Sequence, residues 1–126
     1  MDSGALFERL RGLCMSMPEA TEKPSHGESA WFIRGKSMFA ISSDRHHDDR
    51  VAFWCAAPAG AAEALVARDG TRYFVPPYVG HRGWLGVYLD VDPVDWEEVE
   101  DLVTEAWRAV APKRLRESFD AEAERA

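Results

Sequence analysis

The sequence predicts an α+β fold: a curved, mostly antiparallel sheet of about five strands with helices packed on one face. Three observations lead to this fold class. Short β-prone runs in the middle of the chain are joined by connections too short for a crossover helix, so their strands must pair antiparallel. Segments with helical spacing of apolar residues lie at both ends of the chain, and no repeated strand–helix–strand alternation is present.

The length and composition indicate one domain. A chain of 126 residues, 46% of them hydrophobic, has the usual size of a single core. The domain is expected to span residues 1–118, and residues 119–126 to form a frayed C-terminal tail.

The first expected element is a helix over residues 3–15. Leu6 and Leu10 recur at helical spacing within it. Ser3 is the expected N-cap, and Pro18 follows the end of the helix.

The next elements are expected to be strands joined as hairpins. The runs 30–33 and 38–41 are β-prone, and the connection 34–37 (RGKS) contains a glycine suited to a tight turn. A third strand is expected over 51–55. The segment 42–50, SSDRHHDDR, is therefore expected to be a hairpin loop.

The second half of the chain is expected to complete the sheet and its helical cover. A short helix and two more strands follow, at 58–68, 73–75 and 84–89. The longest helix is expected to open with Asp92 as N-cap and Pro93 at its first position, and to end before Pro112. A short helix is expected to follow over 113–119.

Charge is unevenly distributed along the chain. The net charge is −7, and residues 83–105 carry eight acids and no base, whereas residues 23–82 carry eight bases and six acids. Cys14 and Cys55 lack the spacing of a metal or redox motif, and we expect two buried free thiols. No segment is apolar enough to span a bilayer, and the first residues do not resemble a signal peptide, so a cytoplasmic protein without a membrane partner is expected.

Several stretches, taken in order, resemble the MmcQ/YjbR family. These stretches are LCMSMPEATE at 13–22, His26-Gly27, Arg34-Gly35-Lys36, Met38-Phe39-Ala40, Pro77-Tyr78, GWLGV at 83–87 and the helix 96–107. The resemblance implies a frataxin-like (CyaY-like) arrangement, a curved antiparallel sheet backed by helices. It also implies DNA binding through a double wing of β-hairpins.

The leading functional hypothesis is therefore a non-enzymatic DNA-binding protein. Cations on hairpin tips would contact phosphates, which supply most of the affinity and its salt dependence. Because the chain is acidic overall, binding to duplex DNA is expected to be weak and strongly salt-dependent. The candidate residues are Arg34, Lys36, Arg45, His46, Arg50, His81 and Arg82.

A second hypothesis is a binding module for a protein or a small ligand. Tyr78 and Trp84 flank a glycine-rich stretch that would suit a pocket or groove at the edge of the sheet. A metal site at His46 and His47 is less favoured, because adjacent residues on a strand point to opposite faces. No hydrolase or nucleotide-binding motif is present, and no cofactor or metal is expected.

Overall fold

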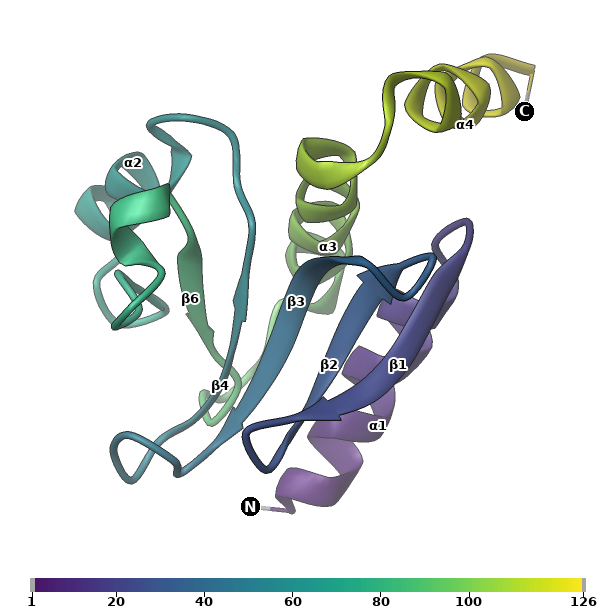
Figure 1. The fold of residues 1–126 in the computed structure, drawn as a ribbon. Helices are drawn as coiled ribbons and strands as arrows, with labels where there is room; N and C mark the ends of the chain where they lie inside the picture. Colours follow the sequence, from purple (N-terminus) through teal and green to yellow (C-terminus); the bar gives the residue numbers. More distant parts are fainter. Residues whose placement is uncertain (1, 126) are drawn as a thin grey trace.

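The computed structural model describes residues 2–125 and confirms the α+β class. Within these residues, one sheet of six strands is accompanied by four α-helices and a short 3-10 helix (Figure 1). In chain order the elements are α1 (Ser3–Met15), β1 (Ala20–Ser25), β2 (Glu28–Ile33), β3 (Ser37–Asp44), β4 (Val51–Cys55), α2 (Ala61–Arg68), β5 (Tyr73–Phe74), η1 (Gly80–Arg82), β6 (Leu85–Tyr88), α3 (Trp96–Val110) and α4 (Lys113–Arg125).

The sheet has the strand order β1-β2-β3-β4-β6-β5, and every neighbouring pair is antiparallel. Successive hairpins build β1 to β4, and β6 then inserts between β4 and β5. The first strand was not predicted, because its sequence ATEKPS is mostly polar and contains Pro24. An edge strand tolerates a proline, since the missing N–H need not reach a neighbour.

The helices and the sheet enclose the core. Figure 1 shows α1 and α3 behind the sheet, while α2 lies beside β5 and β6. The indole N–H of Trp107 on α3 donates to the carbonyl of Pro18 at 3.0 Å, which fixes α3 against the segment after α1. The largest fully buried side chains include Trp31, Phe39, Phe53, Leu85 and Trp107.

Two helix starts differ from the sequence prediction. The carboxylate of Asp2, not the hydroxyl of Ser3, caps α1 by accepting from the N–H of Gly4 at 3.0 Å. The long helix begins at Trp96 with Asp95 as its N-cap, rather than at Asp92 and Pro93. Several aspartates precede this helix, and only the backbone path decides which of them caps it.

The last helix is longer than expected. Residues 119–125 were predicted to fray, but α4 continues to Arg125, and Ala126 lies outside the described residues. The ring of Phe119 packs against Trp107, with the centroids 5.0 Å apart, and Arg108 pairs with Asp120. These contacts hold α4 on the end of α3.

Strand β3 extends into the histidine-rich segment 42–50. Ser42, Ser43 and Asp44 pair with β4, so the irregular loop is limited to residues 45–50.

Within residues 2–125, no helix combines the length and the apolar character that crossing a bilayer requires.

Candidate functional site

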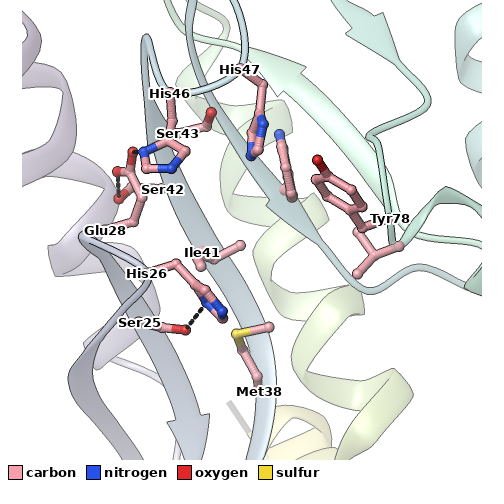
Figure 2. A pocket seen from close by; sticks show the side chains of 12 residues that line it. Ser25, His26, Glu28, Met38, Ile41, Ser42, Ser43, His46, His47 and Tyr78 are labelled. Atoms are coloured by element: carbon pink, nitrogen blue, oxygen red, sulfur yellow. Dashed lines mark hydrogen bonds and ion pairs between the residues drawn. The ribbon is translucent and has the colours of Figure 1, made fainter.

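A pocket of about 490 Å³ opens on the face of the sheet opposite α1 and α3. Figure 2 shows its side chains in front of the strands, with these two helices behind. The lining residues come from the ends of β1 and β2 and the turn between them, from β3, β4 and the β3–β4 loop, and from the segment after β5: Ser25, His26, Glu28, Met38, Ile41, Ser42, Ser43, His46, His47, Trp54, Tyr78 and Val79.

The floor of the pocket is apolar. Ile41 on β3 and Trp54 on β4 are register partners, so their side chains stand side by side on the same face. Both are largely buried, and Met38 extends the apolar floor along β3. This part of the sheet therefore offers a flat surface suited to an apolar group.

Three histidines from two turns line the pocket. In an antiparallel sheet, the β1–β2 turn and the β3–β4 loop lie at the same end, which brings His26 near His46 and His47. The imidazole of His47 stacks on Trp54, with centroids 5.1 Å apart and planes inclined by 26°. The ring of Tyr78 also lies beside His47, with centroids 5.4 Å apart.

Glu28 supplies the charge of the pocket. Its Oε1 accepts from the hydroxyl of Ser42 at 2.8 Å, and its Oε2 accepts from the N–H of Asp44 at 3.0 Å. The Nδ1 atom of His46 lies 3.5 Å from Oε2. Glu28 is the only Asp, Glu, Lys or Arg among the described lining residues. The site therefore combines aromatic and apolar walls with one carboxylate.

Other polar side chains also line the pocket. Ser43 on β3 is only 5% exposed and is one of them. The Oγ atom of Ser25 lies 3.0 Å from Nδ1 of His26, which leaves the second ring nitrogen of that histidine available. A ligand would thus meet both hydroxyl and imidazole groups.

Two residues at the mouth have an unusual backbone conformation. The φ angle is +66° at Tyr78 and +54° at His26, in the left-handed region that bulky residues rarely adopt. Such conformations cost on the order of 1–3 kcal/mol each and occur often at binding sites. Tyr78 is also 76% exposed, so its ring is presented to solvent beside the pocket.

The loop that carries two of the histidines is anchored at its end. The guanidinium of Arg50 forms a bidentate pair with Asp90, at 2.8 and 2.9 Å, and lies 3.8 Å above the ring of Tyr88. Arg50 lowers the pKa of Asp90, with the hydrogen bonds as the main cause. The N–H of Val51 adds a further bond to the same carboxylate at 3.1 Å.

The cations predicted to contact DNA are largely engaged by acids. Arg34 pairs with Glu19 at 2.5 Å, which lowers the pKa of that carboxyl, and Arg45 pairs with Asp44 at 2.9 Å. Arg50 is held by Asp90, as described above. The sequence did not reveal these partners, because Glu19 and Asp90 are distant from the arginines along the chain.

The same cations are also divided between the two ends of the sheet. Arg34 and Lys36 lie in the β2–β3 turn, whereas Arg45 and His46 lie beyond the other end of β3. His81 and Arg82 form part of η1, where Arg82 lies 5.6 Å from the ring of Trp84. The structure does not gather these cations into one patch, and DNA binding stays a prediction.

Tyr78 and Trp84 were predicted to form one site at the edge of the sheet, but the fold does not bring them into the same site. Tyr78 lines the pocket, but Trp84 is only 4% exposed and belongs to the core, just before β6 begins at Leu85. Sequence reasoning missed Glu28 and Trp54 as site residues. Neither residue stands out in the sequence, because Glu28 lay outside any predicted strand and Trp54 is an aromatic residue of the kind found in most strands.

Comparisons with known proteins agree with this architecture. The family model described as YjbR matches residues 15–109. Uncharacterized proteins of Mycobacterium tuberculosis and Mycobacterium bovis are each 33% identical to the chain over 60 residues. That match covers 48% of this chain and 45% of the mycobacterial proteins, so the chain spans about half the length of these curated relatives.

A solved structure shows the same fold. The crystal structure of Deinococcus radiodurans protein DR2400, with a domain described as DUF419, matches with a TM-score of 0.71 at 17% sequence identity. The match covers 90% of this chain and 87% of that chain. At this identity, the likeness concerns the architecture alone.

Proposed function

This chain belongs to the YjbR family, and we propose that it is a non-enzymatic binding protein for a small molecule that occupies the pocket on the open face of the sheet. The observation that carries the proposal is the pocket itself. Its volume of about 490 Å³ lies within the range of roughly 300–1,000 Å³ typical of small-molecule sites.

The composition of the pocket supports the same function. Apolar and aromatic side chains dominate sites that bind small molecules, and a few fixed polar groups orient the ligand. Here Ile41 and Trp54 provide the apolar surface, while Glu28 and Ser43 provide polar groups at fixed positions on strands. Sites built on strands hold their geometry better than sites built on loops alone.

Binding is favoured over catalysis by the way the polar groups are paired. Ser25 and His26 contact each other, as a nucleophile and a base would. However, they are sequence neighbours in an exposed turn, and the nearby carboxylate of Glu28 pairs with His46 instead of His26. Within the described chain, His26 therefore has no carboxylate to orient it as a general base.

The small-ligand function is also favoured over DNA binding. Phosphate contacts require free cations that share one surface. The arginines of the hairpins are instead paired with carboxylates and are separated by the length of the sheet. A polyanion approaching either turn would meet these acids as well.

The proposal can be tested with an uncharged aromatic probe, tryptophol, titrated to about 1 mM. In ¹H–¹⁵N NMR spectra we expect saturable shifts at residues 26–28, 41–47 and 78–79, without shifts at 34–36. Met38→Trp should fill the pocket and weaken binding about tenfold or more.

Met15→Trp is the matched control, because Met15 is exposed on α1 and lies outside the pocket. This variant should bind tryptophol like the wild type. Absence of saturable shifts around the pocket, or equal binding by the Met38→Trp variant, would contradict the proposed function.

A further inference from the structure

We infer that the pocket selects organic cations, namely compounds in which a protonated amine is attached to a flat aromatic body. This inference rests on the proposed function and specifies its ligand. The ammonium group would face Glu28, and the aromatic body would lie on the side of Trp54 and Tyr78. Figure 2 shows Glu28 and Tyr78 on opposite sides of the pocket, with Ile41 between them.

The charges around the pocket favour a cation over an anion. Glu28 lines the pocket, and among the described residues no Lys or Arg does so. The adjoining loop adds Asp48 and Asp49, while its two arginines are already paired, with Asp44 and Asp90 respectively. A carboxylate or phosphate ligand would therefore be repelled by Glu28 without a lysine or arginine to compensate.

Glu28 retains the capacity to accept a hydrogen bond from a ligand. A carboxylate offers about four acceptor positions, and Ser42 and Asp44 each fill one, with His46 at 3.5 Å from Oε2. The side chain is only 10% exposed, so water competes weakly for the remaining position. An ammonium N–H placed there would form a charge-assisted hydrogen bond, which is stronger than a neutral one.

The aromatic side of the pocket already holds a nitrogen heterocycle of the protein. The imidazole of His47 packs against both Trp54 and Tyr78, with ring centroids 5.1 and 5.4 Å away. Because His47 already covers the indole there, the aromatic body of a ligand would lie beside this stack. The exposed ring of Tyr78 offers a further face against which the aromatic body of the ligand can stack.

A metal ion is a poorer candidate for the cation. His26, His46 and His47 all line the pocket, but within residues 2–125 no three His, Cys, Asp or Glu side chains are placed to hold a metal together. His46 and His47 pack edge to face, with centroids 5.0 Å apart, rather than pointing toward a common centre. The imidazoles are engaged in packing against aromatic rings and in pairing with the carboxylate.

Three indole probes separate charge from shape. Tryptamine, tryptophol and indole-3-propionate carry the same ring on a two-carbon linker and end in a cation, a neutral hydroxyl and an anion. We expect tryptamine to bind about fivefold tighter than tryptophol, a ratio that corresponds to one partly exposed ion pair. Indole-3-propionate should bind most weakly.

The variant Glu28→Gln removes the charge while keeping the size of the side chain. It should make tryptamine and tryptophol bind equally, whereas Glu97→Gln, an exposed acid on α3 outside the pocket, should preserve the fivefold preference. If Glu28→Gln does not fold, salt provides a second measurement on the wild type. Raising salt from about 20 to about 500 mM should reduce the tryptamine preference and leave tryptophol binding unchanged.

The outcomes distinguish this inference from the proposed function. Equal binding of all three probes at the pocket would overturn the cation preference and leave the proposed function standing. The same holds if the preference survives in Glu28→Gln or at high salt. Failure of all three probes to bind would overturn both.

Discussion

Replacing Gly86 with alanine should destabilise the protein, because the ring of Phe74 lies directly on this glycine. The two residues are register partners on β6 and β5. A Cβ atom at Gly86 would lie 2.4 Å from two carbons of the ring and 2.5 Å from a third. Carbon atoms pack at about 3.5–4.0 Å, so the ring would have to retreat by about 1 Å.

The retreat would also disturb a neighbouring contact. The ring of Phe74 stacks on Tyr88 at 4.5 Å, and Tyr88 in turn lies beneath the guanidinium that anchors the β3–β4 loop. Overpacking of this kind costs about 1–3 kcal/mol. We therefore expect Gly86→Ala to lower the free energy of unfolding by that amount.

A double-mutant cycle isolates the clash from the backbone effect. Once Phe74→Ala has removed the ring, Gly86→Ala should be neutral or should stabilise by about 0.5–1 kcal/mol, as alanine does relative to glycine within a strand. The coupling energy should be about 2 kcal/mol. Urea denaturation followed by tryptophan fluorescence provides the free energies.

Gly12→Ala is the control for this cycle, because apart from the adjacent backbone of its own helix no atom lies within 4 Å of the Cβ position at this glycine. It should stabilise the protein by about 0.5–1 kcal/mol. The reasoning is refuted if Gly86→Ala is harmless while Phe74 is present, or if the two substitutions are simply additive.

Three further predictions concern ion pairs, thiols and DNA. Arg50 depresses the pKa of Asp90 in the folded state, so the pair stabilises at neutral pH, and this contribution is lost as pH falls through the folded pKa. Asp90→Asn should lower the free energy of unfolding by about 1–3 kcal/mol at pH 7. The variant should also lose less of this free energy on acidification than the wild type does, as measured by urea denaturation at pH 7 and at acidic pH. Burial raises the pKa of Cys55 to about 12 and also raises that of Cys14. Both thiols should therefore react with Ellman's reagent about a hundredfold more slowly in the native protein than in urea. Comparable reaction rates in the two states would contradict the burial of the thiols. Of the seven residues predicted to contact DNA, five are lysines or arginines, and three of these five are engaged in ion pairs. Any binding to duplex DNA should therefore show a log K against log salt slope of about −2, instead of the slope of about −4 expected if all five neutralised phosphates, and Lys36→Ala should reduce the slope by about 1. A slope of about −4, measured by fluorescence anisotropy, would contradict this account.

The sequence predicted those parts of the fold that local patterns determine. Hairpins and helices were predicted correctly because their apolar periods are local. Leu85, Val87 and Leu89 are buried, but Trp84 and Gly86 between them are buried as well, so this strand is covered on both faces. The strand Ala20–Ser25 was missed because its pairing with β2, rather than its own composition, makes it a strand.

The candidate site was less predictable, since it is assembled from distant segments. Tyr78 and His46 were named from the sequence but assigned to different hypotheses, and the fold places both in one pocket. Trp54 carries no signal that separates a core aromatic from a pocket floor. The pairing of Arg50 with Asp90, forty positions apart, depends on where β6 inserts into the sheet.

The two outer strands have a consequence for how the protein behaves at high concentration. On one side, β1 carries Pro24 and a lysine in its middle, and on the other, β5 has two residues and is followed, after Val75, by Pro76 and Pro77. Prolines, charges and very short strands deny an incoming chain the continuous ladder it needs to extend a sheet. These features of the two edges should therefore protect the molecule from edge-to-edge aggregation.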